Sequence, residues 1–183
     1  GRINMLYISE IKKGAPDKKK SGLEGEVHKI LNELKIDFCW VENDEVSTMQ
    51  ECVEINNVLG EEIVKTVFLS NRQKNMLYLM ILPPDKPFYS KAFAKEIEAP
   101  RLSFASGELM EQHLGVSPGS ATIMGLINDK DNNIELVIDK DIAEKEWFAC
   151  NPGTNRSHIK LRTSDLLGKF LPHINHIPKI ISI

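Results

Sequence analysis

The segment Gly115-Val116-Ser117-Pro118-Gly119-Ser120 contains residue types that suit backbone binding of a small polar group. Glycine reaches conformations that other residues rarely adopt, while proline fixes φ and has no N–H. A loop of this composition can direct its remaining N–H groups toward a ligand or a developing oxyanion. The structural alternative is that Gly115 ends a helix in a left-handed conformation and the rest is a turn. The motif alone favours this structural alternative.

Lys65 is an ionisable residue within an apolar run, Ile63-Val64-Lys65-Thr66-Val67-Phe68-Leu69. Lysine is seldom buried without a partner. It is either an edge-strand residue that points to solvent and discourages aggregation, or an ammonium group in a pocket wall. In a pocket wall it would hold a phosphate or a carboxylate. The sequence leaves both interpretations open.

Asn151 and Asn155 form a third cluster, because they flank the turn-forming tripeptide Pro152-Gly153-Thr154. Asparagine side chains in such turns usually bond their own backbone. That explanation would suffice if the segment stood alone.

The familiar catalytic signatures are absent from this sequence, which has no GxSxG, Walker A or HExxH motif. The pair His173 and His176 has no nearby cysteine or acidic third ligand, which disfavours a metal site. Cys150 and His158 have the residue types of a nucleophile and a base, but we expect Cys150 to pack as a small apolar residue on a strand. We therefore expect no metal and no cofactor, and a hydrolase without a protein nucleophile.

The composition is that of an ordinary globular chain: 183 residues, 42% hydrophobic and 27% charged, enough for one domain with a core. No run of eighteen apolar residues occurs, so no membrane span is expected. Three widely spaced cysteines and the lack of a signal peptide favour the cytoplasm. Because the net charge is −3, any RNA partner must be bound locally.

Hydrophobic periodicity and turn residues predict helices and strands in irregular alternation. Helices are expected over 23–35, 47–59, 90–97, 107–114 and 165–171. Strands are expected over 36–41, 63–70, 76–82, 101–105, 121–127, 134–138, 146–150, 157–162 and 179–183. The runs 63–70 and 76–82, and likewise 121–127 and 134–138, are interpreted as hairpins with polar loops.

This pattern predicts a single mixed α/β domain with a central curved, largely antiparallel sheet flanked by helices, over residues 23–183. Residues 1–22 are polar and basic, which indicates a flexible arm. Its lysines, Lys18 to Lys20, are interpreted as a solvated linker rather than an RNA contact.

Together these features resemble the YbaK and prolyl-tRNA-synthetase-associated editing domain family, in its free-standing form. The matching segments, in chain order, are Lys65–Leu69, Arg101–Ser106, Gly115–Gly119, Gly125–Asp129 and Pro152–Asn155. No single segment is diagnostic, but five in order at matching intervals are specific. The resemblance covers about 23–183 and is nearest to bacterial prolyl-tRNA editing proteins, which deacylate alanyl-tRNA mischarged on proline tRNA.

The resemblance implies a set of site residues. The family's strand lysine maps to Lys65 and its glycine–proline loop to Gly115–Gly119. The implied catalytic residues are Lys65, Gly115, Pro118 and Gly119, and the implied substrate-binding residues are Ser120, Asn151 and Asn155. Many relatives carry histidine where this chain has Asn151, which cannot titrate near neutral pH.

The implied substrate is the 3′ end of a tRNA carrying a mischarged amino acid, with prolyl-tRNA synthetase as a candidate partner. Backbone N–H groups of 115–120, except Pro118, would hold the ester carbonyl or a water. Lys65 would hold the phosphate of the terminal adenosine or otherwise orient the 3′ end. The nucleophile would be water, either alone or activated through the substrate's own ribose hydroxyl.

Two alternatives remain open at this point. The first is a non-catalytic regulator that binds aminoacyl-tRNA, a synthetase or an amino acid, an interpretation favoured by Asn151 and the basic arm. The second is a deacylase of cysteinyl-tRNA, which the sequence does not separate from an alanyl-tRNA deacylase.

Overall fold

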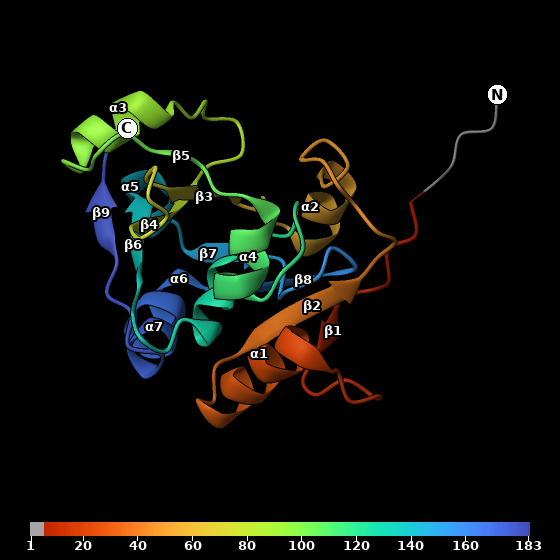
Figure 1. Ribbon diagram of the computed structural model, residues 1–183. Coiled ribbons are helices and arrows are strands. Elements are labelled where there is room, and N and C mark those ends of the chain that lie inside the picture. The colour runs from red at the N-terminus through yellow and green to blue at the C-terminus, as the bar shows by residue number, and fades with distance from the viewer. Residues whose placement is uncertain (1–5) are drawn as a thin grey trace.

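Two β-sheets organise residues 6–183, the part of the chain that the computed structural model describes (Figure 1). The first sheet is entirely antiparallel and has the strand order β1 (Lys12–Lys13), β2 (Phe38–Glu42), β8 (Ser157–Arg162) and β7 (Trp147–Cys150). The second has the order β5 (Ser103–Phe104), β3 (Lys65–Ser70), β4 (Leu77–Leu82), β6 (Ile134–Asp139) and β9 (Lys179–Ile181).

The second sheet is mixed. Strand β3 pairs antiparallel with β4 and β5, whereas β4, β6 and β9 run parallel to one another. The two sheets meet where Ile63 forms a parallel bridge with Ala149, and the Val64 N–H donates to the Ala149 carbonyl at 3.0 Å. The predicted mixed α/β class with flanking helices is therefore confirmed, although the expected central sheet is divided into two joined sheets.

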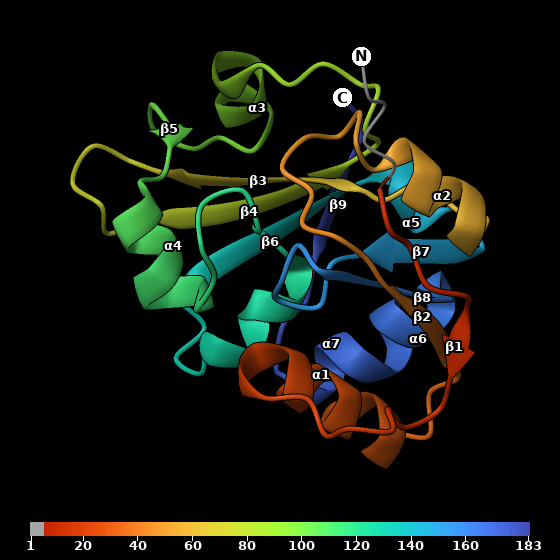
Figure 2. The same ribbon diagram turned by 90° about the vertical axis from the view of Figure 1, so that its right-hand side faces the viewer.

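The helices cover both sheets. The α-helices are α1 (Gly22–Glu33), α2 (Val53–Leu59), α3 (Ser90–Glu96), α4 (Gly107–Leu114), α5 (Lys140–Ala143), α6 (Thr163–Asp165) and α7 (Leu171–His173). A 3₁₀ helix, η1, spans Ile123–Asn128, and a π-helical turn, η2, spans Leu166–Phe170. Figure 2 shows α1 and α2 on opposite sides of the antiparallel sheet, where each packs its apolar face against β2.

The hairpin predicted over 121–127 and 134–138 is wrong. The first run forms η1, whose residues Ile123 to Leu126 are buried, and Thr122 begins it by accepting a hydrogen bond from the Met124 N–H at 3.2 Å. A short run of consecutive apolar residues has no periodicity, so the sequence does not show whether it forms a buried strand or a buried helix. Because β6 pairs parallel with β4, the chain between them is a crossover rather than a hairpin.

The helix predicted over 165–171 is part of a longer helical segment formed by α6, η2 and α7 in succession. No helix of the described residues has the length and hydropathy needed to cross a bilayer.

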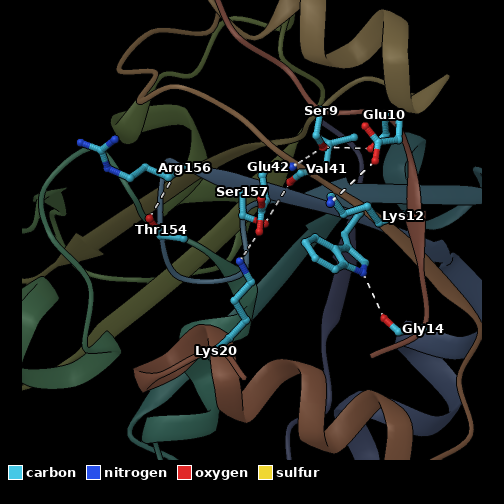
Figure 3. A network of polar contacts seen from close by, with 11 residues as sticks. Ser9, Glu10, Lys12, Gly14, Lys20, Val41, Glu42, Thr154, Arg156 and Ser157 are labelled. Atoms are coloured by element: carbon cyan, nitrogen blue, oxygen red, sulfur yellow. Dashed lines mark hydrogen bonds and ion pairs between the residues drawn. The ribbon is translucent and has the colours of Figure 1, made fainter. Parts of the chain in front are cut away.

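The basic segment before α1 lies along the antiparallel sheet (Figure 3). Strand β1 pairs with β2, the Trp40 Nε1–H donates to the Gly14 carbonyl at 3.1 Å, and Lys20 forms an ion pair with Glu42. These contacts attach the segment in this conformation. Its flexibility stays a prediction, and residues 1–5 lie outside the described part of the chain.

Candidate functional site

A cavity of about 530 Å³ lies beside the first half of β3, near the junction of the two sheets. Four of the predicted site residues line it: Lys65, Gly119, Asn151 and Asn155. The other three, Gly115, Pro118 and Ser120, do not. The described residues that line it include one ammonium group and no carboxylate. This charge pattern suits a ligand that carries negative charge or develops it.

The edge of β3 is uncovered where it borders the cavity. The Val64 N–H donates to the Ala149 carbonyl, and the Phe68 carbonyl accepts from the Ala105 N–H at 2.9 Å. The backbone groups of both residues therefore point to the edge of β3 that faces away from β4. Backbone groups of alternate strand residues point to the same edge. Thr66 lies between them and lines the cavity, so its N–H and C=O face a gap that no strand of the described chain fills.

Lys65 is the first residue of β3 and is half-buried in the cavity wall. Its Nζ donates a hydrogen bond to the Lys86 carbonyl. Because an ammonium group has three N–H donors, two remain for a ligand. The pocket-wall interpretation of Lys65 thus agrees with its position better than the solvent-facing one.

The loop after α4 is partly occupied by its own hydrogen bonds. Gly115 has φ of 69° and its N–H donates to Glu111 at 3.1 Å, so it is the left-handed cap of α4. The Ser120 N–H donates to the Ser117 carbonyl at 3.0 Å and closes a four-residue turn. Pro118 is the second residue of this turn, and Gly119, with φ of 88°, is the third. These are the type II positions for proline and glycine.

The loop hydrogen bonds correct one sequence-based expectation. The N–H groups of Gly115 and Ser120 already have backbone acceptors, so they are not free to hold a substrate oxygen. The Gly119 N–H has no acceptor within residues 6–183, and Gly119 lines the cavity. The N–H groups of Val116 and Ser117 have no acceptor among the described residues either, but neither residue lines the cavity, so Gly119 is the loop donor placed for a ligand there.

Pro118 contacts α4 rather than the cavity. A Cβ atom added to Gly107, the first residue of α4, would lie only 2.6 Å from Pro118 Cγ. The absence of a side chain at Gly107 thus allows the proline to rest on the start of the helix. The structure gives Pro118 a position from which it fixes the loop that presents Gly119.

Asn151 connects the two loops of the cavity wall. Its Oδ1 accepts from the Gly153 N–H at 2.8 Å, as expected for such a turn, and its Nδ2 donates to the carbonyls of Ser120 and Ala121 at 3.4 Å each. Its own carbonyl accepts from Thr122 Oγ1 at 2.7 Å. These contacts connect Asn151 to the loop at the buried Ser120, so the two residues brace the wall.

Asn155 lines the cavity with a side chain that has no hydrogen-bond partner among the described residues. A Cβ atom placed on Gly119 would lie 3.9 Å from Asn155 Nδ2, so the two residues are neighbours. The Asn155 carbonyl accepts from Asn43 Nδ2 at 2.9 Å, which fixes the backbone of the turn. The fold therefore brings Lys65, Gly119 and Asn155 to one cavity with polar groups still available.

Cys150 and His158 do not form a nucleophile–base pair. Cys150 is buried in the core on β7, and burial raises the pKa of its thiol to about 12. Cys52 lines the cavity, and burial raises the pKa of its thiol as well. Neither thiol has the depressed pKa that a nucleophilic thiolate requires. The expectation that Cys150 packs as an apolar residue is confirmed.

His158 is a cavity residue that sequence reasoning did not place in the site. It lies on β8 with 2% of its surface exposed, and its Nδ1 is 2.9 Å from Asn43 Oδ1. Burial lowers its pKa to about 4. No sequence signal links it to Asn43, because only the pairing of β2 with β8 brings the two side chains together.

Two aromatic residues at the cavity were also missed as site residues. Phe104 on β5 is 68% exposed, and its ring centroid is 6.2 Å from that of Phe88. Both line the cavity. Large apolar side chains that lie together at the rim of a cavity are a feature of ligand-binding surfaces, whereas a single exposed one is common on any protein. Within residues 6–183, no three side chains of His, Cys, Asp or Glu are grouped to hold a metal.

Comparisons with known proteins give a consistent result. Residues 43–169 match the model of the aminoacyl-tRNA editing domain. The chain is 31% identical over 136 residues to the prolyl-tRNA editing protein ProX of Acetoanaerobium sticklandii, covering 74% of this chain and 83% of that protein. It is 28% identical over 163 residues to prolyl-tRNA synthetase associated domain-containing protein 1 of Xenopus laevis, covering 87% and 96%.

Solved structures share the fold. A crystal structure described as that of a candidate trans-editing enzyme for prolyl tRNA synthetase matches with a TM-score of 0.63 and 15% identity, covering 89% of this chain and 97% of the other. The structure of a hypothetical protein matches with a TM-score of 0.66 and 16% identity, covering 86% and 99%.

Proposed function

This chain belongs to the aminoacyl-tRNA editing domain family, and we propose that it hydrolyses the ester of alanine mischarged on proline tRNA, acting in trans. The products are free alanine and the 3′-terminal hydroxyl of the tRNA. The prolyl-tRNA editing protein of A. sticklandii supports the choice of tRNA. Prolyl-tRNA synthetase is the proposed partner. The cytoplasm, where this chain would meet the synthetase and its tRNA, is the proposed location.

The observation that carries this proposal is the chemistry of the cavity. It combines the Lys65 ammonium with free N–H groups at Thr66 and Gly119, and it has no carboxylate. Donors fixed in advance stabilise the negative charge that develops on an ester carbonyl under attack. Aminoacyl esters are reactive, so positioning and oxyanion stabilisation suffice, and water supplies the nucleophile.

The aromatic rim supports a nucleotide at the mouth of the cavity. Phe104 pairs with Leu69, which lies four residues beyond Lys65 on β3, so Lys65 and Phe104 are about 13 Å apart along one face of the sheet. A base stacked on Phe104 would leave its phosphate near Lys65 and its ribose ester toward Gly119 and Asn155. Base stacking on aromatic side chains needs no sequence-specific hydrogen bonds.

Replacing Phe104 with Ala should raise KM for aminoacyl-tRNA about tenfold, because stacking on one aromatic ring contributes ~1–3 kcal/mol. Trp or Tyr at this position should restore KM. Tyr89 is the matched control, since it is also 68% exposed but lines a different hollow, beside α3 and the C-terminus. Steady-state deacylation measures both changes. Equal KM values for Phe104→Ala and wild type would exclude the stacking role.

The selectivity proposed for this site is a size limit. Discrimination of one methylene by binding alone is weak, so a second site that admits only small side chains improves accuracy. The loop held by Pro118 against Gly107, and the wall braced by Asn151, would set that limit. Alanine would enter, and larger aliphatic side chains would not.

A regulatory binding module is the second candidate, because the described residues that line the cavity include one imidazole, whose pKa burial lowers to about 4, and one thiol, whose pKa burial raises, so neither is set up as a base or nucleophile. The deciding experiment measures deacylation of proline tRNA charged with alanine, serine, cysteine or proline, and cysteine tRNA charged with cysteine. Turnover of the alanyl ester above the others supports the proposal. Preferred turnover of a cysteinyl ester would reassign the substrate, and binding of free proline without hydrolysis would favour the regulator.

A further inference from the structure

The side chain of Asn43 fixes which nitrogen of His158 carries the proton. Asn43 Nδ2 donates to the carbonyls of Asp44 at 2.7 Å and Asn155 at 2.9 Å, so its amide orientation is set by two acceptors. Its Oδ1 then faces His158 Nδ1 at 2.9 Å. A carbonyl oxygen only accepts, so Nδ1 must carry the hydrogen.

His158 is therefore neutral with an unprotonated Nε2. Burial disfavours the charged imidazolium, and the neutral ring holds its single proton on Nδ1. Nε2 has no hydrogen-bond partner within residues 6–183, and it is not among their fully enclosed polar atoms. Because His158 lines the cavity, Nε2 presents a fixed acceptor to a ligand there.

We propose that Nε2 of His158 accepts a hydrogen bond from the α-amino group of the aminoacyl substrate, which makes this end of the cavity an amine subsite. The inference rests on the proposed deacylase function. The amine is attached to the carbon next to the reacting carbonyl, so holding it also orients the ester. His158 is thus a substrate-positioning residue.

The composition of the cavity selects the amine over other donors. No carboxylate lines it, and Lys65 adds a positive charge, so an amino group entering the cavity finds no anionic partner. Burying an amine without an acceptor costs free energy, because its hydrogen bonds to water are lost. The other polar side chains of the lining, those of Ser47, Thr48, Thr66, Asn151 and Asn155, donate as well as accept. Nε2 can only accept.

A role as general base for the attacking water fits less well. Proton transfer is most efficient to a base whose pKa lies near the working pH, and the pKa of His158 lies well below it. A hydrogen-bond acceptor has no such requirement. It has only to be unprotonated and correctly oriented, and Asn43 supplies the orientation.

The test compares an alanyl ester with a propionyl ester on the same tRNA, since these differ only in the amino group. His158→Asn keeps an N–H near Asn43 but removes the acceptor, and His158→Gln extends an amide to the place of Nε2. His173→Asn, at an exposed position outside this cavity, is the matched control. Hydrolysis without enzyme corrects for the different reactivity of the two esters. Binding of amide-linked alanyl- and propionyl-aminoadenosine gives a readout that does not need turnover.

Wild type should prefer the alanyl ester and the alanyl analogue by about five- to tenfold after correction, as for one hydrogen bond. His158→Asn should remove this preference, His158→Gln should restore part of it, and His173→Asn should leave it unchanged. An equal loss on both esters in His158→Asn overturns the amine subsite and assigns His158 to the ribose or the water, while the deacylase function stands. Failure of wild type to bind or hydrolyse either compound overturns both proposals.

Discussion

Replacing Lys65 with Met should lower kcat/KM for deacylation by about 10²–10³-fold, the usual effect of removing one preorganised donor to a developing charge. Methionine keeps the apolar stem that β3 packs and removes only the ammonium group. The Lys65 Nζ makes a single hydrogen bond within the described chain, to the Lys86 carbonyl, so the fold should survive. Steady-state kinetics with alanyl-tRNA, beside thermal unfolding, measure the two effects separately.

The way in which this loss divides between KM and kcat identifies what Lys65 contacts. If it holds the phosphate of the terminal nucleotide, KM should rise and the slope of log KM against log salt should change by about 0.7, as for one contact to a single strand. If it stabilises the oxyanion, kcat should fall with little change in salt dependence. Lys65→Arg should recover phosphate binding better than oxyanion stabilisation.

A surface lysine provides the matched control for this experiment. Lys91 lies exposed on α3, away from the cavity, so Lys91→Met changes the net charge equally and should leave deacylation unaltered. An unchanged kcat/KM in Lys65→Met would remove Lys65 from the proposed machinery. A large loss of thermal stability would show instead that its bond to Lys86 supports the fold.

The parts of the fold that the sequence predicts well are those with local signals. Ser106 begins α4 by accepting from the Leu109 N–H at 3.2 Å, and Gly115 ends it in the left-handed conformation, so both ends follow from residue type. The run from Ile123 to Leu126 has a capping residue, Thr122, but it shows no periodicity, because all four residues are buried. That the run lies in a crossover rather than a hairpin follows from the parallel pairing of β6 with β4, which is not local.

The same division applies to the site. Lys65 and Gly119 stand out in the sequence by residue type, and the fold brings both to the cavity. The uncovered backbone of Thr66 has no sequence signature, because it depends on where β5 ends and where Ala149 meets the strand. His158 looks like the partner of Cys150 in the sequence, yet its ring bonds to Asn43 from another strand. Long-range pairing, rather than composition, assigns these roles.

Acidification between pH 6.5 and 4 should destabilise the protein by about 3 kcal/mol through His158 alone. Its pKa is about 4 in the folded chain and 6.5 for the exposed group, so the unfolded chain binds more protons in this range. The contribution to stability is therefore fully present above pH 6.5 and is lost as the pH falls to about 4. Urea unfolding at a series of pH values measures it.

The His158→Gln variant lacks the titrating group. Between pH 6.5 and 4 its free energy of unfolding should therefore decrease by about 3 kcal/mol less than that of the wild type. His28 acts in the same direction, because it is buried against Phe38 and Trp40 with no hydrogen-bond partner among residues 6–183, and burial lowers its pKa too. The double variant with His28→Phe separates the two histidines. Parallel curves for wild type and His158→Gln would mean that His158 is not buried as a neutral ring, and the fixed acceptor at Nε2 would be lost with it.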